Sequence, residues 1–170
     1  ELRKLTGHRF KTPGEYAVEL VRFAARHAPG SVEVSVSRGA LRVTGDGAGP
    51  AASLFSQLAT AMDPDAPDES RHGALVALEE QHGLEILAAF ACNPSRVLIE
   101  GPVDGRPRGL EVVTGQPPRR FRSRQREGLS ITVRSRGRSP SAERRLIRER
   151  CRHSVVPIRL DGQPGSRGLW

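Results

Sequence analysis

Apolar residues recur at helical spacing between residues 15 and 27. Tyr16, Leu20 and Phe23 lie three or four positions apart, and Val21 widens the apolar stripe that they form. A Pro-Gly pair stands on each side of the stretch, and such pairs are typical of the start and the end of a helix. The pattern therefore predicts an amphipathic helix over residues 15–27.

The following residues alternate between apolar and polar side chains. Residues 32–36 place valine at every second position, and residues 41–43 repeat the alternation after a turn that contains Gly39. Alternation with a period of two is typical of strands with one buried face, and the short turn joins the two strands as a β-hairpin. Residues 51–62 then return to helical spacing and predict a second helix.

The rest of the chain mixes both patterns. We expect helices over 72–82 and 141–153, and strands over 84–92, 96–100, 109–114, 129–133 and 155–160. Three segments show neither pattern: an N-terminal arm (1–13), an acidic lid-like loop (63–70), and an Arg/Pro-rich loop (116–127) that we expect to be disordered. This order predicts one α+β domain over residues 1–170. It is a two-layer sandwich whose mixed, mostly antiparallel sheet is covered on one face by helices.

Composition narrows the class of protein. At 170 residues the chain can bury a core, and no apolar run approaches the roughly 20 residues that a membrane helix needs. The two cysteines, Cys92 and Cys151, are too few for a disulfide framework and lack the spacing of a metal site. We expect a cytoplasmic, bacterial protein with reduced thiols and no membrane partner.

The net charge of +8 is concentrated in the C-terminal half. Residues 106–152 hold 15 Arg and 4 acidic residues, so the remainder of the chain carries −3. Guanidinium groups pair with phosphates in a bidentate manner, and the stretch therefore predicts a nucleic-acid-binding surface. A solvated arginine face explains the same pattern equally well. The candidate contact residues are Arg119, Arg120, Arg122, Arg124 and Arg126.

The first helix, the hairpin and the glycine-rich turn after it resemble, in that order, the start of the GHKL (Bergerat-fold) ATPases. This superfamily includes MutL and the ninety-kilodalton heat-shock chaperones. Its members carry Glu-x-x-x-Asn on the helix, where the Glu activates water and the Asn holds Mg²⁺. The resemblance implies that Glu19 is the general base and puts Phe23 in the place of the Asn. A phenyl ring offers no oxygen ligand, so Mg²⁺ is not expected at this position.

The second family motif is Asp-x-Gly-x-Gly, whose Asp binds the adenine. Gly45, Gly47 and Gly49 occupy the matching positions, so both glycines are present and Gly45 replaces the Asp. Asp46 follows one residue later, and neighbouring strand residues point to opposite faces. Asp46 is thus either a substitute for the adenine ligand or a turn residue that favours a positive φ.

The third motif is a glycine-rich lid before a helix, which receives phosphates on its backbone amides. Residues 71–75 resemble the MutL version, which implies phosphate contacts from Arg71 and Gly73. Residues 143–158 resemble the helix and strand that close the ATPase domain of the chaperones. The resemblance thus extends over about residues 14–161.

Three functions remain open on this sequence. Absence of both the Mg²⁺ ligand and the adenine ligand implies a non-hydrolysing pseudo-ATPase that serves as an interaction or dimerisation module. Retention of Glu19, Gly47, Gly49 and Gly73 implies instead a divergent domain that binds ATP or ADP. The arginine-rich half implies a nucleic-acid-binding module. The expected partners are accordingly a second copy of the chain, another protein or DNA.

Overall fold

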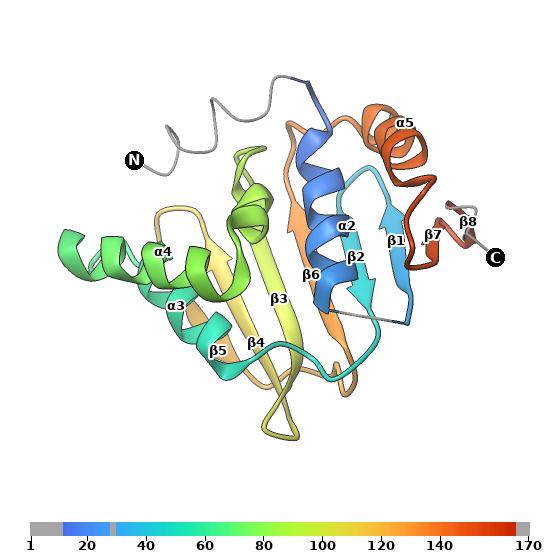
Figure 1. Cartoon of the computed structure of the whole chain (residues 1–170). Coiled ribbons are helices and arrows are strands. Elements are labelled where there is room, and N and C mark those ends of the chain that lie inside the picture. The colour runs from blue at the N-terminus through green and yellow to red at the C-terminus, as the bar shows by residue number, and fades with distance from the viewer. Residues whose placement is uncertain (1–11, 28–29, 166–170) are drawn as a thin grey trace.

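The computed structural model describes residues 12–27 and 30–165 (Figure 1). Of the predicted N-terminal arm, residues 1–11 lie outside this part of the chain. The helices are α2 (Glu15–His27), α3 (Ala52–Met62), α4 (Asp68–His82), the 3₁₀ helix η1 (Leu84–Phe90) and α5 (Pro140–Cys151). The strands are β1 (Val32–Val36), β2 (Leu41–Gly45), β3 (Arg96–Val103), β4 (Arg106–Val113), β5 (Arg119–Phe121), β6 (Leu129–Arg134), β7 (Ile158–Leu160) and β8 (Gln163–Pro164).

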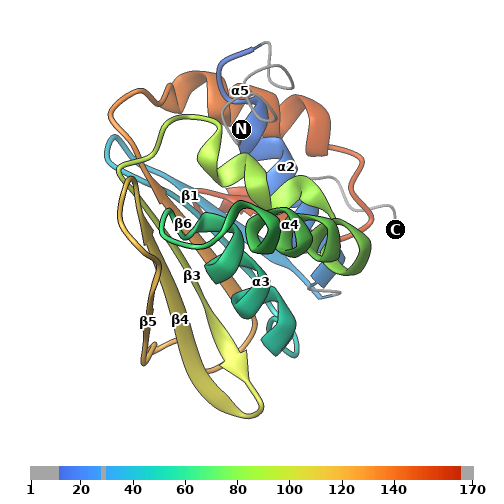
Figure 2. The same cartoon turned by 90° about the vertical axis from the view of Figure 1, so that its left-hand side faces the viewer.

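Within the described residues, eight strands form one sheet in the order β5-β4-β3-β6-β2-β1-β7-β8. Neighbouring strands are antiparallel except for β1 and β7, which are parallel. The helices lie on one face of this sheet, as the side view shows (Figure 2). The predicted α+β two-layer sandwich with a mixed, mostly antiparallel sheet is confirmed.

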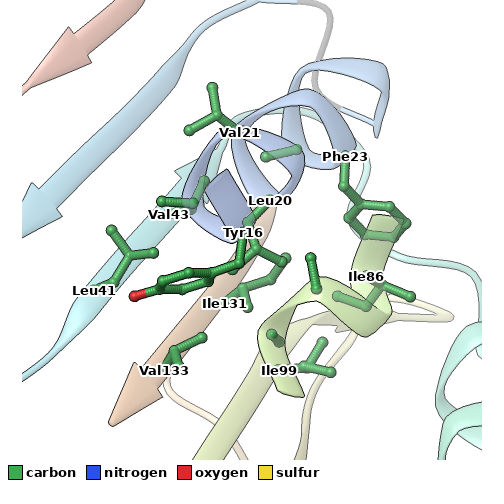
Figure 3. Packing of buried hydrophobic residues seen from close by; sticks show 14 of the residues in the cluster. Tyr16, Leu20, Val21, Phe23, Leu41, Val43, Ile86, Ile99, Ile131 and Val133 are labelled. Carbon is green, nitrogen blue, oxygen red and sulfur yellow. The ribbon is translucent and has the colours of Figure 1, made fainter. Parts of the chain in front are cut away.

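The core lies between the helices and the covered face of the sheet. Leu20 and Phe23 of α2 are 0 % exposed, as are the strand residues Val43 and Ile131 beneath the helix. Figure 3 shows α2 above β2 and β6 with η1 beside it. The apolar periods of 3.6 and 2 therefore mark the buried faces. No helix in residues 12–27 and 30–165 is long and apolar enough to cross a bilayer.

The predicted strand over residues 84–92 is wrong, because this segment forms η1. Ile86, Leu87, Ala88 and Ala89 are all buried, and consecutive buried residues fit a helix wedged between layers as well as a central strand. The segment packs along α2, where it contacts the face that carries Phe23 (Figure 3).

The predicted disordered loop over residues 116–127 is also wrong, because it contains β5 and is held against the sheet. Phe121 pairs with Gly109 of β4, and its ring fills the space that a Cβ at this glycine would need. Ser123 is buried and donates a hydrogen bond to Glu100 at 2.7 Å. The proline and arginine content of the segment therefore wrongly predicted disorder, because the contacts that hold the segment come from other strands.

One helix begins earlier than predicted, and one short strand was not predicted. Helix α4 begins at Asp68 and so takes in the end of the predicted acidic loop (63–70). Acidic residues in a first helical turn are favourable, because they face the positive end of the helix dipole. The strand β8 had no pattern that could predict it, since it is only two residues long.

Candidate functional site

The two residues matched to Glu-x-x-x-Asn lie in different surroundings on α2. The ring of Phe23 packs against the imidazole of His27, with 4.2 Å between ring centroids, and is fully buried. The carboxylate of Glu19 pairs with Arg22 at 2.8 Å. Burial raises the pKa of Cys151 on α5 to about 11; the nearby charge of Arg22 opposes this rise, and that of Glu19 adds to it. Glu19 therefore lies on the side of α2 that meets α5, whereas Phe23 packs towards η1 (Figure 3).

Asp46 holds the start of β1. One of its carboxylate oxygens accepts hydrogen bonds from the backbone N–H groups of Gly30 (3.1 Å) and Ser31 (2.7 Å), and the other accepts one from the Ser31 hydroxyl (2.9 Å). These bonds, the one from the Ser31 N–H first, lower the pKa of Asp46. Its φ is not positive, so the interpretation as a turn residue with positive φ is wrong. Gly47 and Gly49 have that geometry, with φ of 115° and 83°.

The glycines of the turn are in close contact with other parts of the chain. The carbonyl of Gly47 accepts a hydrogen bond from the N–H of Gly128 at 2.9 Å. A Cβ on Gly49 would lie 2.6 Å from the carbonyl oxygen of Pro102. Gly45 is buried at the end of β2, between β1 and β6. Close backbone packing within the fold therefore accounts for glycine at these positions, and a bound nucleotide is not needed to explain it.

Arg71 and Gly73, matched to the phosphate lid, lie inside α4 rather than before it. Arg71 forms an ion pair with Asp68 at 3.4 Å, and its backbone N–H donates to the carbonyl of Pro67. A Cβ on Gly73 would meet nothing within 4 Å. Only the N–H groups of the first helical turn are free to receive a ligand, and the amide of Gly73 lies beyond that turn.

A different glycine precedes a helix and faces α2. Gly83 has φ of 80° and ends α4 directly before η1. A Cβ there would lie 2.7 Å from the guanidinium of Arg26, which forms an ion pair with Glu85. The one signal in the sequence that could have identified Gly83 was its place between the predicted helix over 72–82 and the apolar segment 84–92.

The structure joins two histidines and a serine that the sequence does not connect. The hydroxyl of Ser53 lies 2.9 Å from Nε2 of His82, which ties α3 to α4. Burial lowers the pKa of His82, and nearby His27 lowers it further. His27 in turn donates a hydrogen bond from Nδ1 to the carbonyl oxygen of Phe23 at 2.9 Å. A neutral His82 can accept the Ser53 proton, so the pair has the elements of a nucleophile and a base.

A buried ion pair joins α2, α5 and the loop before α5. Arg138 binds Glu143 at 2.7 Å, and the two side chains are 1 % and 0 % exposed. The Tyr16 hydroxyl donates to Glu143, and burial raises the pKa of Tyr16 above its ordinary value. A hollow of about 280 Å³ lies beside this cluster, lined also by Cys92. Among the described residues, no group of three or more His, Cys, Asp or Glu could hold a metal ion.

The five candidate arginines of the nucleic-acid surface have different roles. Arg119 binds Glu111 at 2.7 Å, and Arg96 binds the same carboxylate at 3.1 Å. Arg120 lines a hollow of about 600 Å³ between β4, β5 and α3. The other three, Arg122, Arg124 and Arg126, are exposed.

A scan against models of known protein families matches none of them, and a search of curated proteins finds no similar chain. The family membership inferred from the motifs therefore stays a prediction, as do the roles that it gives to Glu19 and to the glycines.

Proposed function

We propose that the chain is a GHKL-like domain that does not hydrolyse ATP and that serves as an interaction or dimerisation module. The observation that carries this proposal is the burial of Phe23, which stands where the family holds its Mg²⁺ ligand. A metal ion contributes several kcal/mol of transition-state stabilisation. A phenyl ring packed into the core supplies neither a ligand nor room for that ion.

The surroundings of the other matched residues support the same proposal. Asp46 already accepts three hydrogen bonds from Gly30 and Ser31. Glu19 is paired with Arg22. An adenine amino group or an attacking water would have to compete with these contacts, so neither residue is poised for its family role.

Calorimetric titration with ADP and a non-hydrolysable ATP analogue, each with and without Mg²⁺, tests this function. We expect Mg²⁺ to leave the affinity for either nucleotide unchanged and ATP hydrolysis to be absent. Micromolar binding that requires Mg²⁺, together with hydrolysis that Glu19→Gln abolishes, would identify a divergent ATPase instead. Sedimentation analysis of the same sample measures whether the module forms a dimer.

A second candidate function, nucleic-acid binding, is favoured by the segment that follows β5. Arg122, Arg124 and Arg126 are exposed at alternate positions, and within the described residues none forms an ion pair. The bond from Ser123 to Glu100 holds this segment to the sheet. A fixed segment loses less conformational entropy when it binds a phosphate backbone.

Retention of the chain on duplex DNA at two salt concentrations tests this candidate. We expect retention at about 150 mM salt, and its loss when all three arginines are replaced by glutamine. Retention that vanishes between about 50 and 150 mM salt would indicate only unspecific charge attraction.

A further inference from the structure

The hollow of about 600 Å³ beside α3 has an unusual charge distribution. Arg106 and Arg108 of β4 and Arg120 of β5 line it, and Asp104 is the only acidic residue among its lining residues. Within the described residues, none of the three arginines forms an ion pair or a side-chain hydrogen bond with the protein. The hollow therefore brings together three positive charges that lack protein partners.

The strand register explains why the three arginines gather there. In β4, Arg106 and Arg108 alternate with Pro107 and Gly109, so they lie on the same face as the buried Leu110. Arg120 is the partner of Leu110 across the β4–β5 pair, and partners in adjacent strands share a face. Helix α3 contacts β4 on this side, and Ala52 and Phe55 at the start of α3 line the hollow.

On the opposite face of the same strands, two arginines are neutralised by a carboxylate of the protein. There Glu111 is buried between Arg96 and Arg119, at 3.1 and 2.7 Å. Arg96 and Arg119 thus share one carboxylate partner. The arginines of the hollow differ from these in that respect, which indicates that an anion from outside the chain would complete their environment.

Close backbone packing brings the start of α3 to the wall of the hollow. A Cβ on Gly101 would lie 2.5 Å from the ring of Pro50, and one on Gly49 would lie 2.6 Å from the Pro102 carbonyl. These contacts fix the chain just before Ala52, the first residue of α3, which lines the hollow. The first turn of α3 contains no acidic residue, and its N-cap makes no side-chain hydrogen bond. The positive end of the helix dipole therefore adds to the charge of the arginines.

We propose that this hollow binds an oligophosphate group, either as a free polyphosphate or as the phosphate tail of a nucleotide. Three guanidinium groups match the several negative charges of two or three linked phosphates, and bidentate pairing suits the phosphate oxygens. Neither Glu19 nor Phe23 lines the hollow, so the site does not depend on the function proposed above.

Titration calorimetry with inorganic tripolyphosphate at about 150 mM salt, where screening limits unspecific attraction, is the test. The site variant carries Arg106→Gln, Arg108→Gln and Arg120→Gln. The matched control carries Arg145→Gln, Arg148→Gln and Arg152→Gln, three exposed positions in or next to α5 that do not line the hollow, and it lowers the net charge by the same amount. We expect one tripolyphosphate per chain, affinity about tenfold or more lower in the site variant, and affinity within about twofold of the wild type in the control.

A fourth protein, Ala52→Asp, separates loss of binding from loss of folding. An acidic residue in a first helical turn stabilises the helix, so this variant should unfold at the same temperature as the wild type or higher. The same carboxylate repels phosphate from the wall of the hollow, and we expect affinity to fall about tenfold. Unchanged affinity in a folded Ala52→Asp protein would overturn the proposal.

Titration with ATP in the absence of Mg²⁺ distinguishes the two sources of phosphate. Equal affinity for ATP and tripolyphosphate would identify the phosphates alone as the ligand, and tighter binding of ATP would identify a nucleotide. In both cases the site variant must lose the binding. Failure of the wild type to bind tripolyphosphate, or equal loss in the site and control variants, would refute the site. Mg²⁺-dependent ATP binding that survives in the site variant would contradict the proposed pseudo-ATPase instead.

Discussion

At the scale of single residues, Phe23 is the side chain on which the proposed function rests. Its ring is fully buried and contacts His27, so it belongs to the core as much as Leu20 does. A family comparison at this position sees only a missing Asn. The structure adds that the replacing side chain is apolar and packs between α2 and η1.

Replacing Phe23 by Asn, the residue of the resembled family, should destabilise this protein. The change removes a buried ring and leaves an amide without partners, and we expect the free energy of unfolding to fall by about 3–5 kcal/mol. Urea denaturation measures this loss. Phe23→Leu is the control and should cost about 1–2 kcal/mol, since it keeps an apolar side chain. A loss under about 1 kcal/mol for Phe23→Asn would mean that the site can accommodate a polar ligand.

At the scale of elements, glycines assigned to two different family motifs have opposite structural roles. Gly49 has φ of 83° and lies against the backbone of Pro102, whereas Gly73 is helical and its Cβ position is open. The first is required by a close approach of two loops. The second weakens a helix in which alanine would be more favourable.

Alanine substitution separates these two glycines. Gly73→Ala should raise the free energy of unfolding by about 0.5–1 kcal/mol, because alanine is the better helix former. Gly49→Ala should lower it by more than about 1 kcal/mol, because a side chain there is strained and meets Pro102. Thermal unfolding of both variants is the measurement. Destabilisation by Gly73→Ala would indicate that α4 does not include this residue, as the lid assignment requires.

The contact between α2 and α5 depends on the buried pair of Arg138 and Glu143. We expect Glu143→Gln to lower the free energy of unfolding by about 3–5 kcal/mol, because it leaves the guanidinium buried without its counter-charge. The double variant Arg138→Met with Glu143→Leu should recover most of this loss, since an apolar pair needs no desolvation of charges. Denaturant titration of both proteins checks the order. Equal stability of the single and double variants would show that the pair contributes through shape alone.

At the scale of the whole molecule, His82 links the folding equilibrium to pH. Burial, and secondarily His27, lowers its pKa in the folded state. The unfolded chain then binds the proton more readily, so this contribution to stability is complete above the unfolded value of about 6.5 and is lost as pH falls below it.

We therefore expect the free energy of unfolding to decrease between pH 7.5 and pH 5.5, and the decrease to be smaller in His82→Gln. The exposed His72, replaced by Gln, is the control and should leave the pH dependence unchanged. Urea titrations at the two pH values give the comparison. The same pH dependence in all three proteins would assign the effect to other groups.

The sequence by itself determined α2, the β1–β2 hairpin, α3 and the two-layer α+β class. These elements follow from local periodicity, since residues three or four apart share a helix face and alternate residues share a strand face. The same rule placed Leu20 and Phe23 together in the core. It could assign roles to Glu19 and Asp46 only by resemblance, because their surroundings depend on distant segments.

Only the tertiary structure decided which of these side chains have partners. Asp46 is bound by residues 15 and 16 positions earlier, and Ser53 meets His82 across two helices. Residues 84–90 form a helix, and 119–121 form a strand, because of the layers that they contact. The arginine-lined hollow joins β4, β5 and the start of α3. Contacts between segments far apart in the chain create these features, and a local sequence pattern cannot predict such contacts.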